Sequence, residues 1–335
     1  MSVHPEPSFA HLLRLSDDVG LLEHARGATP RRQHGYCVDD VARGLVVVCR
    51  EPDQGPELLR LSECYLAFIA DAQGPDGDFR NRLTYDRRWA DEPSLGDWWG
   101  RAMWGLGTVI ARSPLPWLRD EAMTCFELGA QRRSDWPRAM AFAALGAAEV
   151  LRACPGHIGA RRLLGHTSTA IGPSTLNGGW PWPEPHLGYA NAAMAEALIV
   201  AGHHLERPAA TSRGLRLLTW LLEHETFNGH LSVTPVGGAM SGRPRPWFDQ
   251  QPIEAAAMAD ACETAFTVTG DPRWREGLRL AVGWFLGDND TKTVMHDAAT
   301  GGGYDGLTPD GPNLNQGAES TIALLTTLQH ARRLD

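Results

Sequence analysis

One helical unit recurs along the chain, and this repeat constrains the fold more than any single motif does. Each unit consists of an outer helix rich in leucine and arginine, a loop, and an inner helix built mainly of alanine and glycine. A unit of this kind cannot bury its own apolar surface, so neighbouring units stack into solenoids or closed toroids. The chain carries about six such units, which predicts an all-α fold in two concentric layers.

The two layers differ in where their helices carry polar residues. Segments 141–148 and 255–259 are almost wholly apolar, as expected for enclosed helices, whereas outer helices keep a charged stripe such as Arg213, Arg216 and Glu223. The expected inner helices are 39–49, 97–110, 134–152, 189–202, 250–268 and 315–331. The expected outer helices are 9–24, 57–72, 117–131, 160–170, 211–224 and 272–286. Together they predict an (α/α)6 barrel of six inner and six outer helices.

Loop length separates two kinds of connection. Inner helices lead to outer ones through short links such as Gly270, Asp271 and Pro272, the usual order of a helix end, a cap and a first turn. Helix direction alternates, so the longer outer-to-inner connections should all emerge at one rim, beside the first turns of the inner helices. Long ordered loops are usually functional, which makes this rim the expected site. The long connections are 74–96, 172–188, 227–249 and 287–314.

Composition limits the classes of partner. The repeats continue through the 335 residues without a linker, which predicts one domain over 1–335. The net charge of -9 and the single lysine leave no basic cluster for nucleic acid. The six cysteines have no Cys-x-x-Cys spacing, which argues against a zinc or redox site. There is no signal peptide or segment of transmembrane length, so a cytoplasmic protein without a membrane partner is expected.

Polar residues gather where the inner helices begin. Asp and Asn at such positions are often helix caps, each contributing about 1 kcal/mol. Acids, amides and aromatic residues that converge around one cavity mouth are also typical of a polyol-binding site. Glu254 and Glu319 follow one turn further along two of these helices. The candidates in the first turns are Asp39, Asp40, Asp97, Asp135, Tyr189, Asn191, Asp249, Gln250, Asn315 and Gln316.

Two of the densest segments contain candidate catalytic acids. In segment 34–43, which includes His34 and Tyr36, one of two adjacent carboxylates can cap the helix while the other faces the cavity with Arg43 as its ion-pair partner. In segment 247–254, Glu254 lies in an alanine-rich helix, where burial would raise its pKa and keep a proton available. A solvated or salt-bridged glutamate is the alternative interpretation of Glu254.

A third segment has the highest density of polar residues. Residues 301–307 and 313–321 place Tyr304, Asp305 and Glu319 close to the amides named above, although the glycines around Asp305 also fit a simple turn. The tryptophans of the long loops present flat faces that suit sugar rings, with packing inside the loops as the alternative. The tryptophans chosen as candidate sugar contacts are Trp98, Trp180, Trp182 and Trp247.

Three local motifs resemble those of a known group of proteins. They are GYCVDDVAR at 35–43, GYDGL at 303–307 and NQGAEST at 315–321. With these motifs and its repeated hairpins, the chain resembles the six-hairpin glycosidase superfamily of (α/α)6 toroids, which includes inverting glycoside hydrolases, unsaturated glucuronyl hydrolases and sugar epimerases. More closely, it looks like a bacterial family associated with glycosyltransferases, which usually has Asn in place of Val41. The resemblance implies a glycan-related toroid with a glycosyltransferase as a candidate partner.

A glycoside hydrolase acting on an oligosaccharide or polysaccharide is the leading expectation. Such an enzyme needs one carboxyl group to protonate the leaving oxygen and another to activate water or attack the anomeric carbon. A helix N-terminus favours an ionised carboxylate, so Asp39 or Asp40 is expected to be the base. Glu254 or Glu319, deeper in the toroid, is expected to be the acid, and Asp305 is a further catalytic candidate. The sequence has neither a nucleotide loop nor a calcium loop, so no cofactor or metal is expected.

Other classes remain open because fold does not identify a reaction. A non-catalytic glycan-binding module, or a subunit docked on a glycosyltransferase, would use the same aromatic residues without a matched acid and base. A sugar epimerase or isomerase would need histidine bases. The loop histidines available for that role are His34, His186, His230 and His296. A terpenoid cyclase is disfavoured because segment 39–43 lacks the third acid of a magnesium-binding DDxxD motif.

Overall fold

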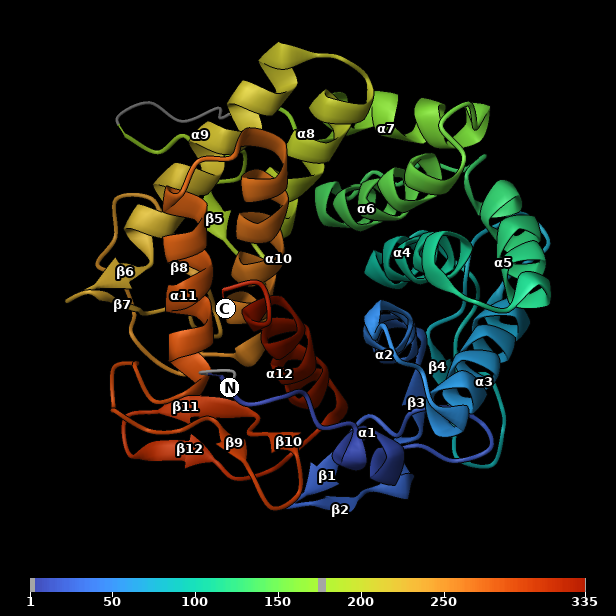
Figure 1. Ribbon diagram of the computed structural model, residues 1–335, viewed down its shortest axis with the longest axis horizontal. Coiled ribbons are helices and arrows are strands. Elements are labelled where there is room, and N and C mark those ends of the chain that lie inside the picture. The colour runs from blue at the N-terminus through green and yellow to red at the C-terminus, as the bar shows by residue number, and fades with distance from the viewer. Residues whose placement is uncertain (1–3, 174–178, 335) are drawn as a thin grey trace.

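The chain folds into a closed ring of helices (Figure 1). A computed structural model describes residues 4–173 and 179–334. The inner layer consists of α2 (Val38–Arg50), α4 (Asp97–Arg112), α6 (Pro137–Ala153), α8 (Ala192–His204), α10 (Pro252–Thr269) and α12 (Ala318–Ala331). The outer layer consists of α1 (Ala10–Leu15), α3 (Pro56–Ala72), α5 (Pro116–Gly129), α7 (Ile158–Ala170), α9 (Pro208–His224) and α11 (Arg273–Phe285).

Contacts between successive inner helices close the ring. Each inner helix packs against the next one, and α12 packs against α2. Each of the first five inner helices also packs against the outer helix that follows it, while α1 packs against α12. These contacts confirm the predicted (α/α)6 barrel.

Small residues explain how closely the inner helices approach one another. A Cβ atom added at Gly107 of α4 would lie 2.2 Å from the carbonyl oxygen of Gly146 in α6, and one at Gly100 would lie 2.2 Å from the carbonyl oxygen of Ala139. Interiors at this packing density have no room for an added methyl group. Glycine is therefore required where α4 and α6 touch through their backbones.

The prediction of a long first outer helix over 9–24 is wrong. Helix α1 ends at Leu15, and Ser16 adopts an extended conformation and pairs with Leu21 in an antiparallel bridge. The side chain of Asp17 accepts hydrogen bonds from the backbone N–H groups of Val19 and Gly20 at 2.9 and 3.2 Å. This local bonding replaces the backbone bonds that a continuing helix would need.

Four inner helices begin later than the sequence indicated. Helices α6 and α10 start at Pro137 and Pro252, where proline fits the first position of a helix because it has no N–H group to donate. Helices α8 and α12 start at Ala192 and Ala318. The polar residues expected in these four first turns therefore lie in the preceding loops. They are Asp135, Tyr189, Asn191, Asp249, Gln250, Asn315 and Gln316.

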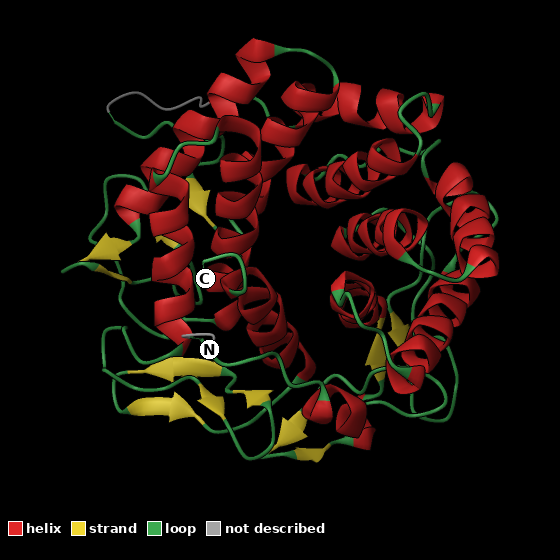
Figure 2. Cartoon of the chain, in the orientation of Figure 1, coloured by secondary structure: helices red, strands yellow, loops and turns green. Residues whose placement is uncertain are grey.

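The long connections form one elaborated rim, as predicted. Short antiparallel strand pairs lie in these loops (Figure 2). The strands are β1 (Ala25–Arg26), β2 (Thr29–Pro30), β3 (Tyr36–Cys37), β4 (Arg82–Leu83), β5 (His186–Leu187), β6 (Thr226–Phe227), β7 (His230–Leu231), β8 (Ala239–Met240), β9 (His296–Asp297), β10 (Gly302–Gly303), β11 (Gly306–Thr308) and β12 (Gly311–Asn313). Pairs β3–β4 and β5–β8 join successive loops, with Tyr36 opposite Leu83 and His186 opposite Met240. Part of the predicted loop 172–188, residues 174–178, lies outside the described residues.

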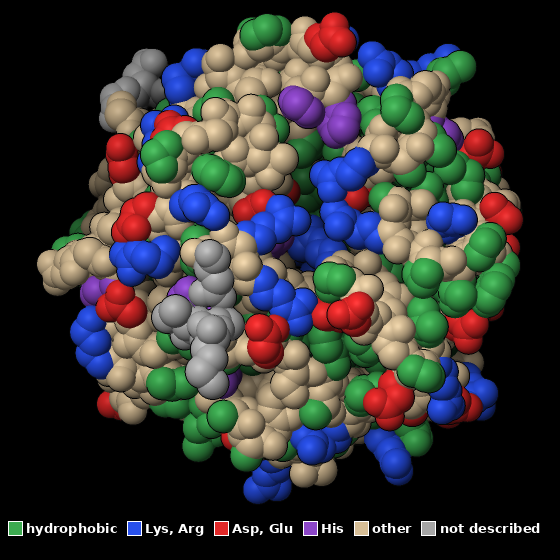
Figure 3. All heavy atoms as spheres, in the orientation of Figure 1, with side chains coloured by type: hydrophobic (Ala, Val, Ile, Leu, Met, Phe, Trp, Pro, Cys, Tyr) green, Lys and Arg blue, Asp and Glu red, His purple; other side chains and the backbone are tan. Residues whose placement is uncertain are grey.

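The opposite, plain rim is formed by the C-terminal ends of the inner helices. Short links join inner to outer helices there, such as 113–115 and 270–272. Arginine and histidine side chains surround a central hollow on this face (Figure 3). Among the described helices, none combines the length and apolar character that crossing a membrane requires.

Candidate functional site

A hollow of about 540 Å³ opens at the elaborated rim, where α2, α4 and α12 begin. Eight of the residues chosen from the sequence line it, drawn from four distant parts of the chain. They are Asp39, Asp40, Arg43, Asp97, Trp98, Tyr189, Asp305 and Glu319. This space is called the rim hollow, and further residues that were not predicted as site residues also line it. They include Glu23, His24, Asn81, Arg82, Gln251 and Asn313.

Arg43 lies at the centre of the acidic cluster. Its Nη2 atom is 2.7 Å from Asp39 Oδ1, 2.7 Å from Asp40 Oδ1 and 3.1 Å from Glu319 Oε2. Spacings of three and four residues bring Asp40 and Asp39 to the same face of α2 as Arg43. The neighbouring helix α12 supplies Glu319. One guanidinium therefore fixes three carboxylates beside the rim hollow.

Asp40 is the most perturbed acid in the rim hollow. Its side chain is only 3% exposed, and its Oδ2 atom accepts a hydrogen bond from the Cys37 thiol at 3.2 Å. Burial raises the pKa of Asp40 to about 7, with Arg43 opposing the shift and the charges of Asp39 and Glu319 adding to it. Asp40 therefore holds a proton in a large share of molecules near neutral pH, which suits an acid better than the expected base.

The helix cap of α2 also differs from the prediction. Neither Asp39 nor Asp40 caps the helix, because the Cys37 side chain accepts the hydrogen bond from the Asp40 N–H group at 3.4 Å. Both carboxylates are thus available to Arg43 and to the rim hollow.

Two aromatic residues form the wall of the rim hollow next to α4. The hydroxyl of Tyr189 donates a hydrogen bond to Asp97, and burial raises the pKa of Tyr189. The indole Nε1 of Trp98 donates to the carbonyl oxygen of Phe79 at 2.8 Å, which fixes the ring. Both rings are half-buried, so each keeps a surface on which a sugar face can pack.

Asp305 lies in the rim hollow but has a structural partner. Its Oδ1 atom accepts hydrogen bonds from the Gly317 N–H group at 2.7 Å and from the Ser320 hydroxyl at 2.6 Å. These bonds satisfy donors at the start of α12, as a helix cap does. Asp305 therefore positions the helix that carries Glu319.

Glu254 lies apart from the residues that line the rim hollow. Its side chain is 4% exposed, and its two oxygens accept hydrogen bonds from the N–H groups of Ala190 and Asn191 at 2.5 and 3.2 Å and from Asn191 Nδ2 at 3.1 Å. Burial raises the pKa of Glu254 to about 8, as expected for a carboxyl in this alanine-rich helix. Its oxygens nevertheless accept hydrogen bonds from the residues that precede α8, so the contacts do not support the expected role of catalytic acid.

Four amide side chains that were predicted to contact a ligand form hydrogen bonds within the protein instead. Asn191 is buried and accepts hydrogen bonds from Gly188 and Arg138. The side chain of Gln250 is buried and bonds Trp284, Ser232 and Asp290. Gln316 bonds Thr300 and Asp297, and Asn315 accepts the Gly27 N–H group at 3.0 Å. These amides hold the rim loops together.

The remaining aromatic, acidic and histidine candidates lie outside the rim hollow. Trp180 and Trp182 are buried against Trp220 of α9, and Trp247 is exposed beside Phe227. The buried Tyr36 donates its hydroxyl proton to Asp17 at 2.6 Å. The other candidates absent from the lining of the rim hollow are His34, Asp249 and Tyr304.

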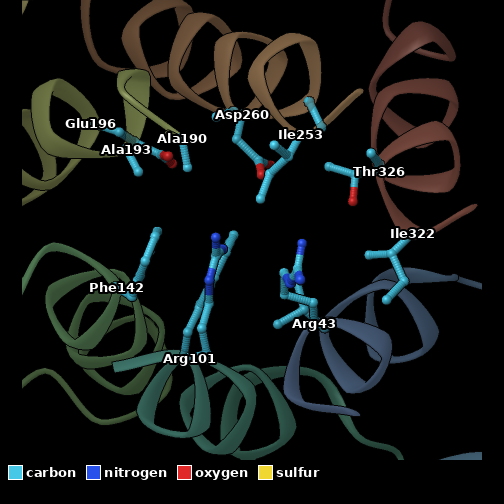
Figure 4. Close-up of a pocket in the computed structure, with 15 residues that line it drawn as sticks. Arg43, Arg101, Phe142, Ala190, Ala193, Glu196, Ile253, Asp260, Ile322 and Thr326 are labelled. Carbon is cyan, nitrogen blue, oxygen red and sulfur yellow. The ribbon is translucent and has the colours of Figure 1, made fainter. Parts of the chain in front are cut away.

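A smaller central cavity of about 40 Å³ lies on the ring axis (Figure 4). It shares Arg43 with the rim hollow, and it shares Trp104, Glu196 and Asp260 with the hollow of the plain rim. Arg43 and Arg101 enter the cavity from one side, and Glu196 and Asp260 face them from the other. The three spaces therefore follow one another along the axis of the ring.

One group of described side chains has the spacing of metal ligands. Ligand atoms of Glu23, Cys37 and Asp40 lie within 4.8 Å of one another. Burial raises the pKa of the Cys37 thiol well above its ordinary value, so the thiolate that binds metals is disfavoured. Arg82 already pairs with Glu23, and Arg43 pairs with Asp40. These partners argue against a resident metal ion.

Solved structures with similar folds cover nearly the whole chain. A sugar epimerase from a ruminal bacterium has a TM-score of 0.71 and 15% identity, over 98% of this chain and 96% of that one. The cellobiose 2-epimerase of Bacillus thermoamylovorans has a TM-score of 0.72 and 10% identity, with the same coverage of 98% and 96%. The cellulase Cel9M of C. cellulolyticum, solved with cellobiose, has a TM-score of 0.65 and 7% identity, over 94% and 87%.

Sequence comparisons add no closer relative. Neither a protein-family model nor a curated protein matches the chain. The resemblance to the glycosyltransferase-associated family therefore stays a prediction. At identities this low, the structural likeness concerns the fold alone. It confirms the (α/α)6 toroid, a fold that this chain shares with solved sugar epimerases and glycoside hydrolases.

Proposed function

We propose that this protein is a glycoside hydrolase that cleaves an oligosaccharide or polysaccharide in the rim hollow. The observation that supports the proposal best is that Asp40 and Glu319 both contact the guanidinium of Arg43. Asp40 is buried, whereas the side chain of Glu319 is 40% exposed. The environment gives the two carboxyl groups different properties, as acid and base roles require. The proposal uses neither a metal nor a cofactor.

In this proposal Asp40 is the acid and Glu319 is the nucleophile. Asp40 transfers its proton to the glycosidic oxygen as the bond from that oxygen to the anomeric carbon breaks. Glu319 forms a bond to the anomeric carbon, and water then hydrolyses this glycosyl ester. Both carboxylates contact Arg43 Nη2, so their nearest oxygens are at most about 6 Å apart, nearer to the roughly 5–5.5 Å of retaining enzymes than to the roughly 6.5–9.5 Å of inverting ones.

The other groups in the rim hollow support a sugar ligand. Trp98 and Tyr189 offer aromatic faces, and Asp39 and Asp97 offer oxygen acceptors for hydroxyl groups. Asp305 fixes the start of α12 and thereby the position of Glu319. A single domain over 1–335, a cytoplasmic location and a glycosyltransferase partner are also proposed, from the sequence.

Single replacements of the two carboxyl groups test this proposal. Asp40→Asn and Glu319→Gln should each lower kcat by about 10²–10⁴-fold on a substrate found by screening mannosyl, glucosyl and galactosyl oligosaccharides. Glu223→Gln on the outer helix α9 is the matched control and should keep wild-type turnover. NMR of the first-formed product should show retained anomeric configuration. Full turnover in both site variants would exclude the assignment. Sugar binding by the wild-type protein without turnover would favour a glycan-binding module.

A sugar epimerase is the second candidate. The two epimerases named above match 98% of this chain and 96% of their own length, and His24 lines the rim hollow. The histidines expected for this role lie elsewhere, and His230, for example, pairs with Asp290 at 2.9 Å. Analysis of the products separates the reactions, because an epimerase changes one stereocentre and leaves the glycosidic bond intact.

A further inference from the structure

Arg101 is a buried cation without a hydrogen-bond partner for two of its nitrogens. Its side chain belongs to α4, is 3% exposed, and points into the central cavity (Figure 4). Among the described residues, none accepts a hydrogen bond from Nε or Nη2. The nearest carboxylate oxygen, Asp39 Oδ2, is 3.8 Å from Nε, which is too far for a hydrogen bond.

The surroundings of Arg101 compensate its charge only in part. The guanidinium carbon lies 3.5 Å from the centre of the Phe142 ring and 5.7 Å from that of Trp104. Cation–π contacts of this kind stabilise a desolvated cation. Because the nearest carboxylate lies beyond hydrogen-bond distance, an anion bound in the cavity would stabilise this buried cation further.

The opposite wall of the cavity carries a second hydrogen-bond donor. Burial, together with the nearby charge of Asp260, raises the pKa of Glu196 to about 8, so its carboxyl group is mostly protonated at neutral pH. Asp260 itself is charged, but Arg50 and His330 contact its Oδ1 atom at 2.6 and 2.7 Å and neutralise it. The protonated Glu196 can therefore donate a hydrogen bond to an anion that pairs with Arg101.

Volume limits which anion fits. The central cavity measures about 40 Å³, and a water-sized group needs about 10–15 Å³ on this measure, so the space admits about three such groups. A carboxylate has this size, whereas a sulfate, a phosphate group or a whole sugar ring is larger. Arg43 lines both the cavity and the rim hollow, so the two spaces adjoin at this side chain.

We propose that the central cavity is a subsite for the carboxylate of an acidic sugar, bound by Arg101. The substrate class is then a glycan that ends in a uronic acid, with the sugar ring in the rim hollow. This inference rests on the proposed function for the location of the sugar. The acids of the rim hollow do not exclude such a ligand, because Arg43 and Arg82 pair with several of them and Asp40 holds a proton in a large share of molecules.

Binding of matched monosaccharides tests the subsite without any need for turnover. Methyl uronides of glucose, galactose and mannose are each titrated calorimetrically against the wild-type protein beside the corresponding neutral methyl glycoside. At least one uronide should bind about tenfold or more tightly than its neutral partner, since hydrogen bonds between charged groups are the strong ones. The 6-sulfate and 6-amino-6-deoxy analogues should show no such gain.

Two arginine variants test whether Arg101 causes the preference for the uronide. Arg101→Gln should reduce the preference for the uronide to about onefold, while Arg119→Gln, which removes the same charge from the exposed face of α5, should leave it unchanged. Thermal unfolding checks that both variants are folded. If Arg101→Gln does not fold, the relative affinities of the wild-type protein for the uronide, neutral, 6-sulfate and 6-amino-6-deoxy ligands still test the subsite, because they require no variant.

The outcomes separate this inference from the proposed function. Equal binding of every uronide and its neutral glycoside, no binding of either, preference for the sulfate or amine, or a uronide preference that survives Arg101→Gln would each overturn the subsite. None of these results bears on whether Asp40 and Glu319 catalyse hydrolysis. Conversely, full turnover by Asp40→Asn and Glu319→Gln would remove the hydrolase assignment and leave the binding result intact.

Discussion

The two rims of the ring use their charged side chains in different ways. At the plain rim the contacts are matched, since Arg50 and His330 share Asp260, and Arg112 forms two hydrogen bonds with Glu149. At the elaborated rim, Arg43 pairs with three carboxylates. In the central cavity next to it, Nε and Nη2 of Arg101 have no hydrogen-bond partner among the described residues.

The difference supports the proposal that the elaborated rim is the functional end and that the plain rim stabilises the ring. Burial alone would raise the pKa of Asp260, but Arg50 and His330 hold it down at about 2, so this carboxylate stays charged and paired. For Asp40, burial outweighs Arg43 and leaves its pKa near 7. Fully satisfied networks make a structure rigid, whereas shifted and incompletely paired groups are typical of functional sites.

Breaking a matched pair at the plain rim should have the largest effect on stability. Asp260→Asn leaves Arg50 buried without its anion and should lower the free energy of unfolding by about 3–5 kcal/mol at pH 7, measured by urea denaturation. Glu319→Gln at the other rim removes a half-exposed partner of Arg43 and should cost about 1 kcal/mol or less. Equal losses in the two variants would contradict the distinction between the rims.

The pH dependence of the Asp260 effect has a defined sign. The folded-state pKa of Asp260 is lowered from 3.8 to about 2, so the unfolded chain binds its proton first as the solution is acidified. The stability that Asp260 contributes is complete above pH 3.8 and is lost as the pH falls through about 2. The difference between wild type and Asp260→Asn should therefore shrink over this range. A difference that stays constant with pH would show that ionisation is irrelevant.

A buried acid behind the elaborated rim should have a smaller structural effect. In Glu254→Gln, an amide nitrogen that cannot accept hydrogen bonds replaces one of the oxygens that bond Ala190 and Asn191. The variant should lose about 1–3 kcal/mol of unfolding free energy, because a buried donor is left unpaired. Glu223→Gln on the exposed face of α9 is the control and should change stability by less than about 0.5 kcal/mol. No loss in Glu254→Gln would leave its catalytic role open again.

Periodicity was enough to predict the ring but not the exact helix starts. Apolar residues repeat strongly along the inner helices, and their alanines and glycines allow close packing. The starts depend on local bonds instead. Pro137 and Pro252 begin two helices later than the polar residues before them suggested, and the carboxylate of Asp305 determines where α12 begins. A partner distant in sequence cannot be identified from the residues beside the helix.

The candidate site was predictable only where one helix supplies several of its groups. Asp39, Asp40 and Arg43 share a face of α2, so their spacing indicated an ion-pair cluster. Asn191 and Gln250 had equally suitable chemistry, but partners on other helices use their hydrogen bonds. Arg101 was missed, although it follows Asp97 by four residues on α4 and its spacing could have placed it on the same face.

Glu196 tests the boundary between the two rims, because it lines both the central cavity and the plain-rim hollow. Its folded-state pKa is raised from 4.5 to about 8, so the native state keeps a proton that the unfolded chain releases. Wild-type stability due to this group is therefore complete below pH 4.5 and is lost as the pH rises toward 8. Glu196→Gln preserves an oxygen that can accept the Thr264 hydroxyl, as Oε1 does at 2.7 Å. The variant should match wild type near pH 4.5 and exceed it by up to about 4 kcal/mol near pH 8, measured by urea denaturation. A variant that is less stable than wild type at the higher pH would show that Glu196 is a charged, paired residue like its plain-rim neighbours.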